Sequence, residues 1–189
     1  MNNKLFQYAG IAASVVLIAF GIGAVVIGLN GRDRVATELG REQIVGTPDS
    51  TIPNQLVNTG GEAQAFAKVM RKHTLEATGG KTYAQMPQFL DASGKGTNDK
   101  AAAAKDPKTG APTSNPARQI WVTETALTTA LNTAFFADSM ATFVAAIGGA
   151  LLLIGIGFLV LSLTLLRRPS AESVQRSTGP VAKVAVGSA

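Results

Sequence analysis

The chain contains no cysteine and one histidine, His73, among its 189 residues. The absence of cysteine excludes disulfide bonds, thiolate catalysis, cysteine-ligated zinc and iron–sulfur clusters. A single histidine excludes the H-E-x-x-H zinc helix, and a Ser-His-Asp triad would have to use His73 without a G-x-S-x-G turn. We therefore predict no catalytic residue, no metal site and no cofactor, and an enzyme is the least favoured class of function.

Charge is also scarce. Charged residues make up 15% of the chain and hydrophobic residues 46%, whereas a typical soluble chain carries roughly 25% charge. The apolar excess is concentrated in two runs without a charged residue, 9–29 and 139–166. About 20 apolar residues at a rise of 1.5 Å cross a hydrocarbon core of about 30 Å. Both runs are therefore predicted to be transmembrane helices.

Two other interpretations of these runs are disfavoured. A pair of buried soluble helices is disfavoured because too little chain remains to cover them. The first run follows Lys4, as in a secretory signal peptide, but it is longer than the usual apolar region of about 7–15 residues, and no A-x-A pattern follows it. An uncleaved membrane anchor is the favoured interpretation.

The distribution of basic residues predicts the orientation. Residues 1–8 and 167–189 together carry five Lys or Arg and one acidic residue, whereas 30–138 carries twelve basic and eleven acidic residues. Basic residues near the spans mark the cytoplasmic side, and charges within a long loop count for little. We expect both termini in the cytoplasm, a tail over 167–189 that is disordered, and 30–138 on the other side of the membrane. No basic stripe interleaved with aromatics indicates nucleic-acid binding.

Small residues recur every seven positions in both runs, which favours an antiparallel transmembrane hairpin packed along these stripes. The alternatives are that glycine is simply common in membrane spans, or that the stripes face another protein. The spans contain no ionisable residue, which weighs against a pump or carrier. The helix-packing residues are predicted to be Ser14, Gly21 and Gly28 in the first run and Gly148, Gly155 and Ser162 in the second, with Ser14 nearest Ser162.

The segment between the runs is predicted to be mainly helical, so the fold class is an all-α membrane protein. A break at Gly31 precedes a helix over 32–45, and a second helix over 62–78 stops at two glycines. Residues 91–115 lack large apolar side chains and are predicted to be a mobile loop. Asn115 as a cap before Pro116 starts one helix that continues through the second span to about Arg167.

Two patterns in this segment invite a functional interpretation. Gly79-Gly80-Lys81-Thr82 resembles the end of a phosphate-binding loop, but the required first glycine is replaced by Leu75 and no strand precedes it, so a helix stop is favoured. Glu124, Leu131 and Asp138 repeat every seven residues and would attract cations or meet a basic partner, although solvent exposure is the simpler account.

Trp121 lies about 27 Å of helix before the second span, so we expect it to pack in the outer domain or at an interface. The predicted partner contacts are Trp121, Glu124 and Asp138.

Four segments resemble uncharacterised two-span membrane proteins of actinobacteria. They are YAGIAAS at 8–14, EQIVGTPD at 42–49, HTLEATGG at 73–80 and NPARQIWVTET at 115–125. The resemblance implies a bacterial cell-membrane protein and carries over no activity and no catalytic residue.

The expected function is that of a non-enzymatic accessory or scaffold subunit in a membrane or cell-envelope complex. Its expected partners are the lipid bilayer and another membrane or envelope protein, or a second copy of the chain. The alternative is a small homo-oligomeric channel or transporter subunit whose glycine-rich spans line a pore. A sensor module ranks third.

Overall fold

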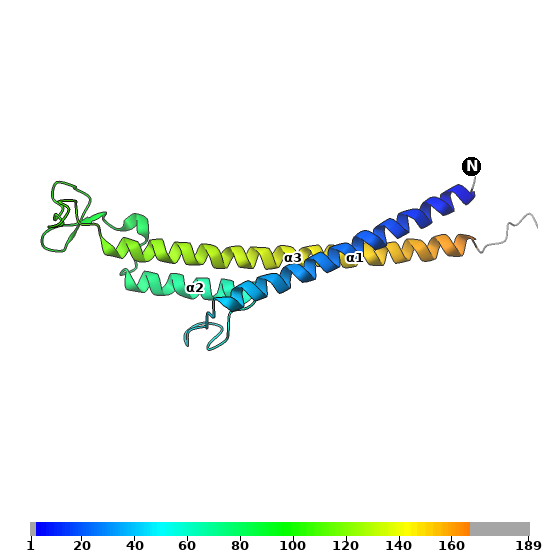
Figure 1. The fold of residues 1–189 in the computed structure, drawn as a ribbon, viewed down its shortest axis with the longest axis horizontal. Helices are drawn as coiled ribbons and strands as arrows, with labels where there is room; N and C mark the ends of the chain where they lie inside the picture. The colour runs from blue at the N-terminus through cyan, green and yellow to red at the C-terminus, as the bar shows by residue number, and fades with distance from the viewer. Residues whose placement is uncertain (1–2, 167–189) are drawn as a thin grey trace, which may run out of the picture. The chain divides into compact units, whose positions relative to one another are not determined.

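The computed structural model describes residues 3–166, which are mostly helical (Figure 1). Its elements are α1 (Asn3–Arg41), α2 (Gly60–Ala77), a short 3-10 helix η1 (Tyr83–Gln85), strands β1 (Phe89–Leu90) and β2 (Gly96–Thr97), and α3 (Pro116–Leu166). They form two units, one containing the residues up to Val25 and those from Ala146, and the other Val26–Ala145. The predicted tail over 167–189 lies outside the described residues.

Helices α1 and α3 are long and apolar enough to cross a membrane, over Leu5–Arg41 and Pro116–Thr164. In the most apolar window of each helix only 11% of the residues are buried. The core helix of a soluble protein buries most of its apolar residues, so the rest of the described chain does not cover these surfaces. The prediction of two apolar, span-length helices is confirmed.

Helix α1 shows that the predicted break at Gly31 is wrong. The helix runs without interruption from Asn3 to Arg41. A glycine inside a helix costs only about 1 kcal/mol relative to alanine, which packing readily offsets. Here a methyl group built on Gly31 would lie 3.1 Å from the Cβ of Ala141, so the glycine permits a close approach of α3. The helix also stops before the predicted Val45, because Gln43 adopts a left-handed φ of 51°.

Helix α2 begins and ends with signals that its sequence carries. The Thr59 hydroxyl accepts from the backbone N–H of Glu62, and the Glu62 carboxylate accepts from the backbone N–H of Thr59 at 2.9 Å. At the other end Gly79 and Gly80 have φ of +62° and +74°, and the N–H of Gly80 donates to Leu75 O at 2.7 Å. The predicted helix stop at this pair of glycines is confirmed.

The core of the second unit joins α1, the connection to α2, α2 itself and α3. Val57, in the connection, is fully buried. The loop around it is closed by Val57 N–H donating to Ile44 O at 2.8 Å and by Gly46 N–H donating to Gln55 O at 2.9 Å. The buried core residues are Leu39, Val57, Ala63, Ala67 and Leu131, with Val35, Ile44, Ile52, Phe66, Met70 and Ala134 packed against them.

The segment between η1 and α3 corrects the all-α expectation. Strands β1 and β2 pair antiparallel, with Phe89 opposite Thr97, and bridges join Asp91 to Ala103 and Lys105 to Pro112. Aspartates support the turns between these pairs: Asp91 Oδ1 accepts from the backbone N–H groups of Ser93 and Lys95, both at 2.9 Å. Backbone pairing and aspartate-capped turns thus organise a stretch that contains few large apolar side chains.

Candidate functional site

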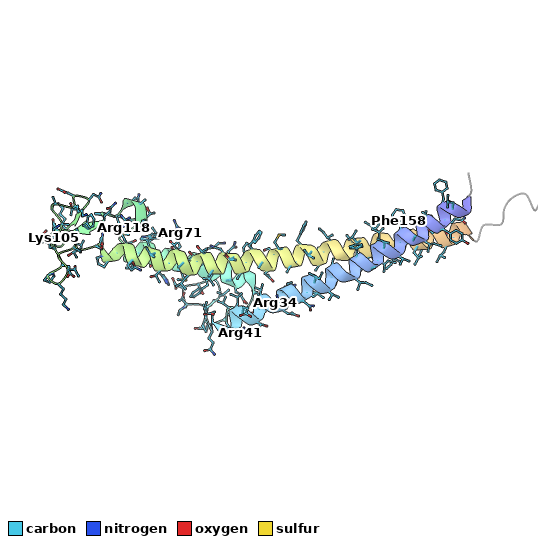
Figure 2. The ribbon with its side chains drawn as sticks, turned by 45° about the horizontal axis from the view of Figure 1, so that its top comes forward. Arg34, Arg41, Arg71, Lys105, Arg118 and Phe158 are labelled. Atoms are coloured by element: carbon cyan, nitrogen blue, oxygen red, sulfur yellow. The ribbon has the colours of Figure 1, made fainter. Side chains whose placement is uncertain are left out.

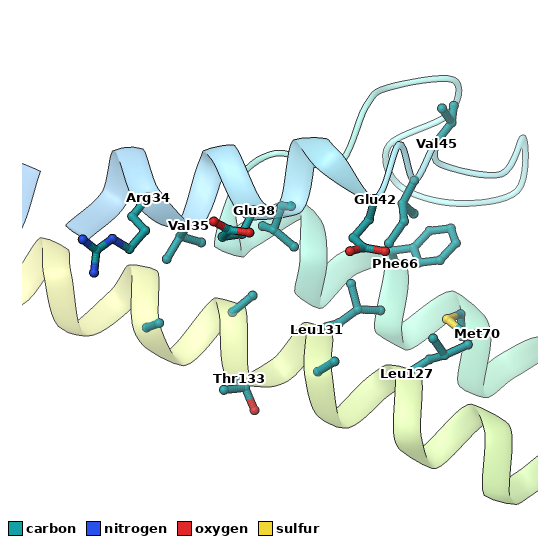
Figure 3. Close-up of a pocket in the computed structure, with 15 residues that line it drawn as sticks. Arg34, Val35, Glu38, Glu42, Val45, Phe66, Met70, Leu127, Leu131 and Thr133 are labelled. Atoms are coloured by element: carbon teal, nitrogen blue, oxygen red, sulfur yellow. The ribbon is translucent and has the colours of Figure 1, made fainter. Parts of the chain in front are cut away.

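An apolar groove lies in the second unit, between the last turns of α1, the side of α2 and the middle of α3 (Figure 3). Its volume is about 850 Å³. Its polar lining residues are Arg34, Glu38, Glu42 and Thr133. Its apolar lining residues are Val35, Leu39, Ile44, Val45, Phe66, Met70, Leu127, Ala130, Leu131, Ala134 and Ala137.

The groove exists because one of its walls is made of small side chains. Ala130, Ala134 and Ala137 line it from α3, spaced so that they share one face of the helix. An alanine has no atoms beyond Cβ, so this face leaves open the space that larger side chains would fill. The floor is continuous with the core, because Leu39 and Leu131 are 7% and 4% exposed. The groove is therefore an unfilled extension of the hydrophobic core.

Charge lies along only one side of the groove. Arg34, Glu38 and Glu42 line it from α1, and Figure 2 shows Arg34 and Arg41 on the last turns of that helix. Arg41 donates to both carboxylate oxygens of Glu38, at 2.8 and 2.9 Å. The wall formed by α3 carries no charged residue between Glu124 and Asp138. An occupant of this groove would thus meet a charged rim on α1 and an uncharged wall on α3.

The predicted helix-packing residues are all buried. Between residues 5 and 30 the buried positions of α1 are Ser14, Gly21 and Gly28, and between 139 and 164 those of α3 are Gly148, Gly155 and Ser162. A methyl group built on Gly21 would lie 2.9 Å from the carbonyl oxygen of Gly148. One built on Gly28 would lie 2.6 Å from the carbonyl oxygen of Ala141. At both points the two backbones approach too closely for a side chain.

Toward the N-terminus of α1 and the C-terminus of α3, the predicted neighbours are Ser14 and Ser162. In the structure the Ser162 hydroxyl lies against Gly10, where an added methyl group would be 2.5 Å from its Oγ. The Ser14 hydroxyl donates to the carbonyl oxygen of Gly10 at 2.7 Å, so it is satisfied within α1. Gly155 lies against Ile18, whose backbone nitrogen would be 3.1 Å from an added methyl group.

Trp121 is buried inside the second unit, with 3% of its surface exposed. Its indole Nε1 donates to the carbonyl oxygen of Lys81 at 2.9 Å and lies 3.3 Å from the hydroxyl of Thr78. The guanidinium of Arg71 stacks over the ring, 5.2 Å from its centroid. Trp121 therefore packs inside the second unit, between α3 and the turn after α2.

The predicted stripe of Glu124, Leu131 and Asp138 faces other elements of the second unit. Glu124 and Leu131 are each 4% exposed, so the expectation of solvent exposure is wrong for Glu124. The Asp138 carboxylate accepts from Arg32 Nε at 3.3 Å, which links α3 to α1. Asp138 also lies against Gly60, where an added methyl group would be 2.6 Å from its Cβ.

Asp49 joins the loop before α2 to the helix itself. Its Oδ2 accepts from Lys72 Nζ at 2.8 Å and lies 2.9 Å from His73 Nε2. The hydrogen bond from Lys72, and then that from His73, hold the pKa of the Asp49 carboxyl well below its ordinary value. The His73 side chain is half-exposed, and its ring nitrogen is hydrogen-bonded to the Asp49 carboxylate. Within residues 3–166 no three His, Cys, Asp or Glu side chains are grouped so as to hold a metal ion.

Comparison with protein-family models, curated proteins and solved structures found no match. The groove was not predicted from the sequence, because its walls come from three helices and a loop that are far apart in the chain. The one signal for it was the spacing of alanines at 130, 134 and 137 on a single face of α3.

Proposed function

We propose that this chain is a non-enzymatic, two-span membrane protein, an accessory or scaffold subunit that holds another membrane or envelope component in its groove. The observation that carries the proposal is the open apolar groove of about 850 Å³ beside the core of the second unit. Ligand sites are typically apolar concavities of about 300–1,000 Å³ with a few polar groups placed at the edge. The four polar side chains on the rim and wall fit this description.

The exposed surfaces of α1 and α3 support the membrane part of the proposal. Phe20, Ile22 and Leu153 are 71%, 52% and 73% exposed. Each fully exposed side chain of this size forgoes about 1.5–3 kcal/mol of burial in water, and lipid removes that penalty. Helices in lipid associate through close approach at small residues, and Gly21 against Gly148 is such an approach.

The proposed orientation places both termini in the cytoplasm of a bacterial cell and the second unit outside the membrane. The excess of basic residues in 1–8 and 167–189 supports it. The resemblance to two-span membrane proteins of actinobacteria agrees with a bacterial cell membrane. In this arrangement the groove faces the outer surface, where envelope components are accessible.

The groove is tested by filling it. Ala130 is exposed and lines the groove, whereas Asn132 is exposed on the same helix and does not line it. Full-length wild type, Ala130→Trp and Asn132→Trp are extracted in mild detergent, and the proteins and lipids that co-purify are identified by mass spectrometry. We expect a stoichiometric component with wild type and Asn132→Trp that is lost from Ala130→Trp.

Equal recovery of every component with both tryptophan variants would contradict a binding role for the groove. A homo-oligomer that conducts ions after reconstitution, with no other component bound, would favour a channel subunit instead. Both outcomes are read from the same preparation, by native mass and by ion flux in vesicles.

A further inference from the structure

The groove begins where the two uncharged runs end. Arg34 lies five residues beyond Leu29 on α1, and Ala137 lies two residues before Ser139 on α3. At 1.5 Å per residue both points are within about 8 Å of the ends of the runs along the helix axes. The headgroup layer of a bilayer is about 5–8 Å thick on each side. If the runs cross the membrane as proposed above, the groove opens into the outer headgroup layer.

The groove is too small to be a protein interface on its own. Stable protein interfaces bury about 800 Å² on each partner, and the surface exposed inside the groove is a small fraction of that area. Its volume of about 850 Å³ instead lies within the range of sites for single small ligands. From Leu127 to Ala137 the α3 wall of the groove is lined by Ala, Leu and one Thr, so most of its length is apolar. These dimensions favour a slender apolar chain.

The charges indicate which end of such a ligand is polar. Arg34 lies at the end of the groove nearest the uncharged runs, and Leu127 and Met70 lie at the far end (Figure 3). Arg34 forms no ion pair with any residue in 3–166. A guanidinium binds a phosphate through paired N–H donors. Glu38 and Glu42 follow further out on the same wall and repel an anion from that part of the groove.

We infer that the groove holds one acyl chain of a phospholipid from the outer leaflet, with its phosphate at Arg34. The inference rests on the proposed function, because it requires the uncharged runs to lie in the bilayer. The acyl chain leaves the bilayer at Ala137 and follows the alanine face outward past Leu131 to Leu127. The headgroup stays at the membrane surface, where Arg34 is the available cation.

The test is crosslinking from the acyl chain. The full-length protein is reconstituted in phosphatidylglycerol–phosphatidylcholine nanodiscs that contain a phospholipid with a diazirine near the end of one acyl chain, and adducts are mapped by mass spectrometry. Leu127 lies about 18 Å along α3 from Ser139, beyond the reach of acyl chains that remain in the bilayer. We expect adducts at Leu127 or Met70 in wild type and in Asn132→Trp, and their loss in Ala130→Trp.

Adducts on the uncharged runs are the internal control, because they report insertion and should be the same in all variants. Arg34→Gln should weaken groove labelling by about tenfold, which is the contribution of one charged hydrogen bond, and Arg34→Lys should retain part of it. Adducts confined to the uncharged runs in wild type would overturn the lipid assignment. A co-purifying protein that Ala130→Trp releases would also overturn it, while leaving the proposed binding role of the groove intact. Absence of adducts from the uncharged runs would instead contradict the membrane proposal.

Discussion

The indole Nε1 of Trp121 donates a hydrogen bond to the backbone carbonyl oxygen of Lys81 at 2.9 Å. This bond fastens the start of α3 to the turn that ends α2, and the ring is almost completely buried there. Arg118, one turn earlier, donates to the carbonyl oxygen of Met86 at 3.0 Å and stacks on Tyr83, 3.9 Å from the ring centroid. Two aromatic contacts thus hold the end of the second unit at which α3 begins.

Trp121→Phe should destabilise this unit by about 1–3 kcal/mol. The substitution removes the only indole in the chain and leaves the carbonyl oxygen of Lys81 without this donor. Thermal unfolding of the full-length protein in detergent, followed by circular dichroism, should show a lower Tm. Val122→Ala, at an exposed neighbouring position, is the matched control and should leave Tm nearly unchanged. Equal Tm values for Trp121→Phe and wild type would show that the hydrogen bond contributes nothing.

Gly148→Val should disrupt the pairing of α1 and α3, whereas Gly149→Val should not. A methyl group on Gly148 would lie 2.7 Å from Val25 N and 2.8 Å from Gly21 O, and one on Gly149 would meet nothing within 4 Å. The expected cost at Gly148 is at least about 1–3 kcal/mol, typical of overpacking. Both variants replace a glycine of α3 with valine, so the change in helix propensity is the same in both. Resistance to thermal unfolding and to protease in detergent should fall only for Gly148→Val, and an equal loss in both variants would argue against this contact.

A disulfide should form between cysteines introduced at Gly31 and Ala141. A Cβ on Gly31 would lie 3.1 Å from the Cβ of Ala141, slightly shorter than the separation of about 3.5–4.5 Å found in disulfides. Because the chain has no other cysteine, non-reducing gels report this pair directly. Gly31→Cys with Met140→Cys is the control, since Met140 is 45% exposed and points away by one helical step. Crosslinking of the control pair alone would place the wrong face of α3 against α1.

Asp49→Asn should weaken the link between the loop and α2 in a pH-dependent way. The folded-state pKa of Asp49 is lowered, chiefly by Lys72 and then by His73, so its contribution to stability is present above the unfolded pKa and is lost as the pH falls toward the folded value. The difference in Tm between wild type and Asp49→Asn should persist down to about pH 5 and shrink below about pH 4. A difference that stays constant down to pH 2 would mean that charge on Asp49 is not its source.

Local signals in the sequence were sufficient for the long elements. Pro116 after Asn115 set the start of α3, and the two glycines after Ala77 set the end of α2 within one residue of its predicted position. The uncharged runs revealed both span-length helices. These features depend on short-range capping and on the charge of consecutive residues, which a sequence displays directly.

Contacts between residues that are far apart in the chain are harder to predict from the sequence. The interpretation of Gly31 as a break failed because its neighbour across the pair, Ala141, is 110 residues away in the chain. Solvent exposure is the usual state of a lone carboxylate, but Glu124 is buried on the side of α3 where Trp121 and Leu131 contact α2. The groove depends on α1, α2 and α3 together. No single segment contains the information for it.

In the proposed topology α1 and α3 both cross the membrane and place the second unit outside the cell. Its most direct measurement is labelling of single cysteines, in intact cells that express the full-length chain, with a membrane-impermeant maleimide. Lys108→Cys lies in the second unit, and Ser177→Cys lies in the C-terminal tail. We expect labelling of Lys108→Cys in intact cells and of Ser177→Cys only after the membrane is permeabilised. Labelling of Ser177→Cys in intact cells, or protection of Lys108→Cys until permeabilisation, would contradict it.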